Sequence, residues 1–310
     1  MINWLRRLSF LWPTGIILGT AWAAVELVDL ELLLHIPWGS AGTFVLFVCW
    51  LVFPFALAFL WHFLLLWFGA SSLTRNQIVH VQLASWLGRY LPIKIGQVLG
   101  KVVIGQRYGL PISIGTASSL METFLFILSG CLGAGLLLLY VDSPNTRLAF
   151  ALGVIGVLAV PPVYTLLKQR RLLNWVPVLP DLMPEAMAFQ KWLLWVSGYL
   201  LTHFIIAVGF YFLLDAFSVR DSIPGFFWLF SVVCFSHVAG ILVFVAPAGI
   251  GAREAALTFL LTPFMGLETA ATVSAVARLI SLAADATLVP VYLSIQKRCF
   301  QDIQKVKPSA

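Results

Sequence analysis

Charged residues inside long apolar runs are the parts of this sequence most able to do chemistry. Glu122 lies within the apolar run 112–141, and a polar stripe follows one helical face of the run 269–296. The residues of this stripe are Ser274, Arg278, Ser281 and Asp285. A charge at membrane depth costs roughly 2.5–3.5 kcal/mol on insertion scales. We therefore expect these residues to face protein or a water-filled cavity rather than lipid.

A second group of candidates surrounds a stretch rich in Pro and Gly. Arg253 and Glu254 directly follow the segment Pro247–Gly251, which contains Gly249. Irregular backbone at membrane depth is tolerated only where it is buried in protein or lines a cavity. A helix that restarts there presents free backbone N–H groups, which can bind an anion. Gly249, Gly251 and Arg253 would therefore suit a phosphate group.

The segment 76–108 carries basic residues that could bind a phosphate from the cytoplasmic side. They are Arg89, Lys94, Lys101 and Arg107. Contact with the anionic lipids of the inner leaflet explains the presence of these basic residues equally well. For the intramembrane charges, a second interpretation is that they pair with one another and only hold helices together. Two mid-span histidines, His203 and His237, could relay protons or could be neutral rings packed in the core.

Composition restricts the class of protein. Of the 310 residues, 61% are hydrophobic and 10% are charged, whereas a typical soluble domain has roughly 45–50% and 25%. These values exclude an ordinary soluble enzyme, a disordered chain and a disulfide scaffold. The four cysteines lie far apart, and the sequence has no motif for a nucleotide, a zinc ion or a nucleophilic serine. We expect no cofactor, no nucleic-acid partner and no enzymatic activity.

The apolar runs predict an all-α protein, a polytopic bundle of membrane helices that forms a single domain over 1–310. The runs are 8–28, 41–68, 112–141, 148–167, 192–214, 224–246 and about 269–296. A membrane helix needs about 20 such residues. Two further stretches, 76–108 and 247–266, are apolar but broken by Gly, Pro and charges. Whether they cross the membrane or re-enter, and how many chains assemble, stays open.

The distribution of Lys and Arg predicts the topology. With the N-terminus in the cytoplasm, 15 basic residues fall inside and two, Arg147 and Arg220, fall outside. This scheme has about eight crossings, because it counts 250–266 as one and treats 76–108 as a re-entrant or surface segment. Both termini then lie in the cytoplasm.

A weak internal repeat conflicts with that scheme. Pro92–Gly96 and Pro247–Gly251 share the pattern P-x-x-I-G, 155 residues apart. The spacing is half the chain, as a duplicated unit of about 1–145 and 190–296 would give. A version with seven crossings and two re-entrant segments would give the two repeated segments the same topology, but it would put the basic C-terminus outside. We favour the charge rule.

The residues Ala246-Pro-Ala-Gly-Ile-Gly-Ala-Arg-Glu254 resemble a family signature, P-x-G-x-G-x-R-E. It is that of the lysylphosphatidylglycerol synthase transmembrane region, also called the flippase-like domain family. The first half is similar to the family in Gly88-Arg89-Tyr-Leu-Pro92, and then in Gly96, Arg107 and Glu122. Arg278 with Leu279 matches as well, so that the resemblance covers about 75–296. Lys94 departs from the family, in which small residues are common at that position.

The resemblance implies a bacterial inner-membrane protein that handles lipids. Some members are fused to a soluble aminoacyl-transferase domain, for which we expect no counterpart here. We expect translocation of an anionic or polyprenyl-linked lipid between leaflets. Arg253 and Arg278 would hold the headgroup phosphate, and Glu122, Glu254 and Asp285 would balance charge or couple protons. The expected partners are membrane lipids and enzymes of envelope biosynthesis. The alternatives are a non-transporting accessory subunit of envelope lipid or glycan synthesis and, less favoured, an intramembrane lipid-modifying transferase.

Overall fold

The computed structural model describes residues 37, 39–70, 73–90, 95–141, 143–169, 188–243 and 247–306. The expected run 8–28 lies outside these residues. Every regular element in the described ranges is a helix, which confirms the all-α class. The elements are α3 (Ala41–Trp67), α4 (Arg75–Leu87), η1 (Gly88–Tyr90), α5 (Ile95–Arg107), α6 (Ile112–Gly135), η3 (Leu136–Tyr140), α7 (Pro144–Gln169), α9 (Phe189–Ala216), η4 (Arg220–Ser222), α10 (Phe226–Leu242), η5 (Pro247–Gly249), α11 (Ala252–Met265) and α12 (Leu267–Val306).

Five described helices are long and apolar enough to cross a membrane, which confirms a polytopic helical membrane protein. They are Ala41–Trp67, Ile112–Tyr140, Pro144–Leu166, Phe189–Ala216 and Leu267–Cys299. The apolar helix α10 is shorter, with 17 residues, and α11 has 14. At 1.5 Å per residue, α11 is about 21 Å long, which is less than the roughly 30 Å of a bilayer core.

Each of the two Pro/Gly-broken stretches takes part in a helical hairpin. The stretch 76–108 forms the α4–α5 hairpin, and 247–266 forms the second arm of the α10–α11 hairpin. In the first, Ser85 of α4 donates a hydrogen bond to the Gln97 carbonyl of α5 near the tip. At the open end, the hydroxyl of Tyr108 lies 2.7 Å from Nδ1 of His80. In the second hairpin, the rings of Trp228 in α10 and Phe264 in α11 pack with centroids 4.5 Å apart at the open end. Each hairpin therefore returns to the end of the bundle from which it came.

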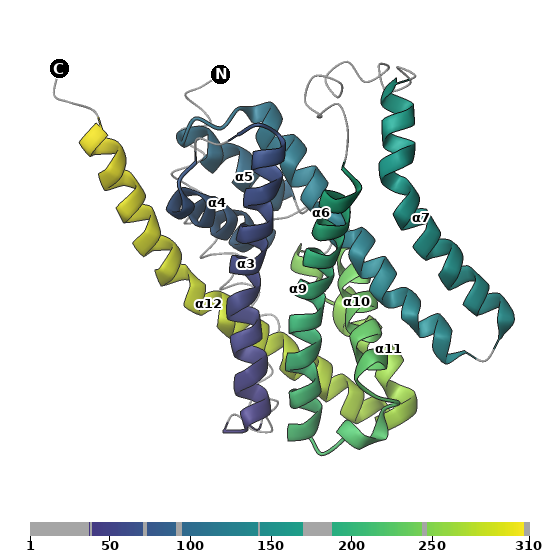
Figure 1. Ribbon diagram of the computed structural model, residues 1–310. Coiled ribbons are helices and arrows are strands. Elements are labelled where there is room, and N and C mark those ends of the chain that lie inside the picture. The colour runs from purple at the N-terminus through teal and green to yellow at the C-terminus, as the bar shows by residue number, and fades with distance from the viewer. Residues whose placement is uncertain are drawn as a thin grey trace.

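The two hairpins enter from opposite ends of the bundle. Helices α3 and α9 lie side by side (Figure 1) and run antiparallel, because Gly42 at the start of α3 packs against the end of α9. The first hairpin follows the end of α3, and the second follows the end of α9. Their tips meet inside the bundle, where Tyr90 packs with Ala248 and Ile250.

This geometry refines the predicted topology. The two apolar segments that we counted as crossings over 224–266, at 224–246 and 250–266, form the α10–α11 hairpin, which returns to the end of the bundle where it begins. Within the described residues, these two segments are therefore not crossings. The predicted re-entrant character of 76–108 agrees with the α4–α5 hairpin.

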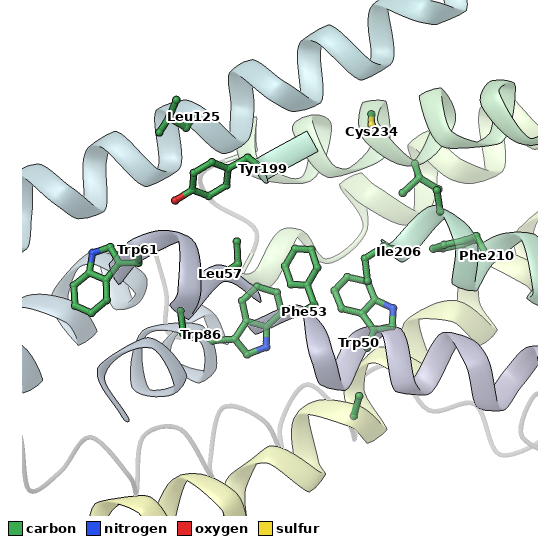
Figure 2. Close-up of a cluster of buried hydrophobic side chains, with 14 of the residues drawn as sticks. Trp50, Phe53, Leu57, Trp61, Trp86, Leu125, Tyr199, Ile206, Phe210 and Cys234 are labelled. Carbon is green, nitrogen blue, oxygen red and sulfur yellow. The ribbon is translucent and has the colours of Figure 1, made fainter. Parts of the chain in front are cut away.

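The core lies between the central helices and the hairpins. Trp50 and Phe53 of α3 lie beside Trp86 of α4 (Figure 2), with ring centroids 6.3 and 5.1 Å from the Trp86 ring. The long helix α12 crosses the bundle obliquely, whereas α7 stands at one edge (Figure 1) and is mostly exposed. In an apolar chain such an edge helix presents its side chains to lipid. Several buried charged side chains, among them Arg89 and Arg253, lie at the two hairpin tips.

Candidate functional site

A cavity of about 130 Å³ lies where the two hairpin tips meet. Its polar lining consists of Gln82, Ser85, Arg89, Gln97, Lys101, Ser119, Glu122, Thr123, His237 and Arg253. Trp50, Phe53 and Trp86 are among its aromatic walls. A water molecule needs roughly 10–15 Å³ measured in this way, so the cavity holds several waters or a small polar group. Both halves of the chain contribute residues.

The first charged cluster of the site is centred on Asp285 of α12. Its carboxylate forms an ion pair with Arg89 and accepts a hydrogen bond from the Tyr90 hydroxyl. Its second oxygen accepts from the indole Nε1 of Trp86 at 2.8 Å. The Arg89 guanidinium stacks 3.7 Å from the centre of the Trp86 ring. Asp285 is fully buried and both of its oxygens are occupied, so this cluster joins α12 to the tip of the first hairpin.

The second cluster pairs Lys101 of α5 with Glu122 of α6. Gln82 of α4 donates a further hydrogen bond to Glu122 at 3.2 Å. The Lys101 ammonium also lies 4.5 Å from the centre of the Trp61 ring. Each charge therefore has a counter-charge and a neighbouring dipole or ring, as buried ions require.

Arg253 differs from both clusters. It is the second residue of α11, is 6% exposed, and lines the cavity. Its guanidinium carbon lies 4.5 Å from the centre of the Trp50 ring. Its Nε atom is buried without a hydrogen-bond partner, and among the described residues no carboxylate lies within 4 Å of the guanidinium. Arg253 is thus a buried cation held against an aromatic face.

The backbone of the second tip depends on glycine. Gly249 has a φ of 72°, and a Cβ atom there would lie 2.9 Å from the Gly240 carbonyl oxygen of α10. A side chain would therefore be strained and would push the tip away from α10. This close approach fixes Arg253 beside the cavity, since a Cβ added at Gly240 would meet the Cβ of Arg253 at 3.3 Å.

One of the backbone N–H groups that we predicted to be free to bind an anion at this tip is already occupied. The Gly251 N–H donates a hydrogen bond to the Glu254 carboxylate at 2.7 Å, so the helix caps itself. The same carboxylate lies 3.7 Å from Nε of Arg278. Glu254 therefore serves the helix start and α12, and a bound anion would depend on the Arg253 side chain rather than on this amide.

Arg278 is placed on the other side of the tip. It is 2% exposed and lines a second, largely apolar hollow together with Gly251 and Glu254. Its three nitrogens are buried, and none donates a hydrogen bond within the described residues. Arg253 and Arg278, which we predicted to hold one phosphate together, therefore line different hollows.

The remaining predicted residues divide as follows. Arg89, Glu122, Gly249 and Arg253 line one cavity, and Asp285 lies directly behind Arg89. Arg107 ends α5, is half-buried, and lines neither hollow. Lys94 lies outside the described residues. Lys101 and His237, which we named as a possible phosphate-binding residue and a possible proton relay, also line this cavity. Gln82 was not singled out, although a polar group near other polar residues in an apolar region is a signal that could have identified it.

No metal centre is indicated in the part of the chain that is described, where no three His, Cys, Asp or Glu side chains lie close enough to share an ion.

Comparison with protein families gives one informative result. The family model described as lysylphosphatidylglycerol synthase TM region matches residues 9–288. Comparisons with curated proteins and with solved structures found no match.

Proposed function

We propose that this chain, which belongs to the lysylphosphatidylglycerol synthase TM region family, moves an anionic or polyprenyl-linked lipid between the leaflets of a membrane. The observation that carries the proposal is Arg253. A cation buried without a counter-ion is costly, and a bound anion would remove that cost. The ligand that fits is a lipid headgroup with a negatively charged phosphate.

The charges around the cavity support an anionic ligand. Arg89 and Lys101 are each offset by a buried carboxylate, those of Asp285 and Glu122. Glu254 accepts a hydrogen bond from the Gly251 amide and lies 3.7 Å from Arg278, and it acts on Arg253 as a negative charge from outside ion-pair distance. Among the described residues, Arg253 therefore has no carboxylate within ion-pair distance, and a negatively charged headgroup in the cavity would give it a partner.

The arrangement of the hairpins supports movement rather than storage. The cavity lies between two tips that enter from opposite ends of the bundle, so each tip separates the cavity from one end. Broken helices that meet at mid-depth are the usual construction of transporter sites. A small displacement of one tip would open the cavity to one leaflet while the other tip keeps it closed. Transport of this kind leaves the lipid chemically unchanged.

The charge distribution adds the setting. The family resemblance favours a bacterial inner membrane. We place both termini in the cytoplasm, because 15 basic residues then lie inside. The returning α10–α11 hairpin is compatible with this orientation. In this arrangement, the first hairpin enters from the cytoplasmic side and the second from the outside.

The test is lipid movement in liposomes that contain the purified full chain. The probe is phosphatidylglycerol with a fluorescent acyl chain, and its exposure is read by a quencher that cannot cross the membrane. Zwitterionic phosphatidylcholine with the same label is the comparison. We expect faster movement of the anionic probe than in empty liposomes. Arg253→Met should slow it about tenfold or more, because charged hydrogen bonds are worth about 1.5–3 kcal/mol.

A matched control is Arg220→Met, since Arg220 lies on η4 outside the cavity and pairs with Asp215 at 2.8 Å. It should move lipid like the wild type. An Arg253→Met protein that is as fast as the wild type would remove Arg253 from the site. A wild type that is no faster than empty liposomes, with either probe, would contradict transport and favour an accessory role.

A further inference from the structure

Two histidines from different helices form a hydrogen-bonded pair beside the cavity. Nδ1 of His203 in α9 lies 2.9 Å from Nδ1 of His237 in α10. Nε2 of His203 lies 3.2 Å from the backbone carbonyl oxygen of Phe126 in α6. His203 is fully buried, and His237 is 6% exposed and lines the cavity. Within the described residues, Nε2 of His237 has no hydrogen-bond partner.

These contacts assign the protons of the neutral pair. A carbonyl oxygen only accepts, so Nε2 of His203 must carry a proton. A neutral imidazole carries one proton, so Nδ1 of His203 is an acceptor and Nδ1 of His237 is the donor between the rings. Nε2 of His237 is then a bare lone pair. It belongs to the ring that lines the cavity, and it is free to take a proton.

The pair can gain one proton without losing a hydrogen bond. A proton that binds to Nε2 of His237 leaves the bond between the rings and the bond to Phe126 unchanged. A second proton would have to go to Nδ1 of His203, where it would face the N–H of His237. The geometry therefore limits uptake to one proton, and it directs the new N–H group away from His203.

The surroundings make uptake depend on an anion. Arg253 of α11 and Arg89 of η1 act on His237 as nearby positive charges, while α3 offers only the rings of Trp50 and Phe53. The other charged groups of the cavity, Lys101 and Glu122, are paired with each other. A proton on His237 would add positive charge next to Arg253, and a bound anion would offset it.

Carboxylates are the more obvious proton carriers, but here they are occupied. Glu122 is held by Lys101 and Gln82, and Asp285 is held by Arg89, Tyr90 and Trp86. Nε2 of His237, in contrast, is a buried nitrogen of the described cavity lining that has no hydrogen-bond partner.

We infer that the His203–His237 pair is a proton site, and that one proton binds to Nε2 of His237 when an anionic headgroup enters the cavity. The proton comes from the bulk solvent, where the buffer replaces it, forms an N–H bond to Nε2 of His237, and returns to the solvent when the headgroup leaves. This inference rests on the proposed function. It adds that the lipid anion and a proton bind, and are released, together.

The test counts protons during binding. The purified full chain in detergent is titrated with dioctanoyl phosphatidylglycerol by calorimetry, at neutral pH, in two buffers that differ in ionisation enthalpy. A phosphodiester does not titrate in this range, so the buffer dependence reports protons taken up by the protein. We expect close to one proton per bound lipid. Through the range in which one proton is taken up per lipid, the affinity should fall by about tenfold for each unit by which the pH rises, because uptake of one proton links binding to pH.

His237→Gln is the diagnostic variant, since glutamine keeps a polar side chain but does not titrate. It should bind the lipid more weakly and without uptake of a proton. His62→Gln is the matched control, because His62 lies on α3 and does not line the cavity. It should behave as the wild type.

Two results would overturn the inference in distinguishable ways. Binding by the wild type without proton uptake would refute the proton site but leave the anion site standing. Absence of phosphatidylglycerol binding by the wild type would refute the proposed function and the inference with it. Because both measurements use the unmodified protein, neither depends on the folding of a variant.

Discussion

Asp285 and Arg253 are both charges buried near the meeting point of the hairpin tips, but their surroundings differ. Asp285 has both oxygens occupied by Arg89, Tyr90 and Trp86. Arg253 has an aromatic face on one side and, among the described residues, no ion-pair partner. A closed cluster, in which every charge is paired, holds helices together. A buried charge without an ion-pair partner, an open charge, can instead bind a ligand. Burial alone does not distinguish the two roles, and hydrogen-bond partners do.

The largest expected effect is the loss of the closed cluster. Asp285→Ala leaves Arg89 buried without its counter-ion, which typically costs about 3–5 kcal/mol. We expect a marked fall in the unfolding temperature in detergent, or no folded protein. Glu268→Ala is the control, because Glu268 is exposed in the first turn of α12 and contributes roughly 0.3–1 kcal/mol there. Equal unfolding temperatures for the two variants would show that the Asp285 cluster does not hold the bundle.

A smaller effect is expected for the second closed pair, and a double-mutant cycle measures it. Lys101→Met and Glu122→Gln each leave one uncompensated charge, whereas the double variant leaves none. The double variant should therefore be less unstable than the sum of the two single changes, with a coupling of about 1–3 kcal/mol in the free energy of unfolding. Strict additivity would mean that the ion pair contributes nothing to stability.

The smallest structural effect concerns the backbone that places Arg253. Gly249→Ala introduces a side chain at positive φ against Gly240 and should cost about 1–3 kcal/mol. Gly153→Ala in α7 is the control, because a Cβ there meets no atom within 4 Å. It should leave the unfolding temperature unchanged or raise it slightly. If both variants unfolded alike, the close approach of the tip to α10 would not be required.

The sequence predicts part of this comparison, because a charge or a helix break within an apolar run can be recognised from the neighbouring residues alone. Glu122, Arg278 and Asp285 could be identified as buried polar groups, since each lies within an apolar helical run. The Pro/Gly break before Arg253 could also be located, because these residues interrupt a helix wherever they occur. The family was predicted from the same motif, and the match over residues 9–288 confirms it.

The partners could not be predicted, because they come from distant segments. Asp285 meets Arg89 across 196 positions of the chain, and His203 meets His237 across 34. The separation of Arg253 from Arg278 depends on which side of the tip each occupies. The return of the α10–α11 hairpin depends on its packing, as at Trp228 and Phe264, rather than on hydropathy.

The predicted repeat now has a geometric counterpart. In each half a long helix precedes a hairpin, and the two hairpins enter from opposite ends and meet at their tips. A duplication with inverted orientation would produce this arrangement, and it would also keep the basic residues on one side. The conflict between the repeat and the charge rule then disappears, although the duplication itself stays a prediction.

The most direct test of the open site is the unfolding temperature with and without an anionic lipid. Dioctanoyl phosphatidylglycerol should raise the Tm of the wild type, because a ligand that binds only the folded state stabilises it. Arg253→Met should show no such rise, and without lipid its Tm should equal or exceed that of the wild type, since an unpaired buried charge has been removed. Arg253→Met with the full lipid-dependent rise, or with a Tm lowered as in Asp285→Ala, would contradict an open anion site at Arg253.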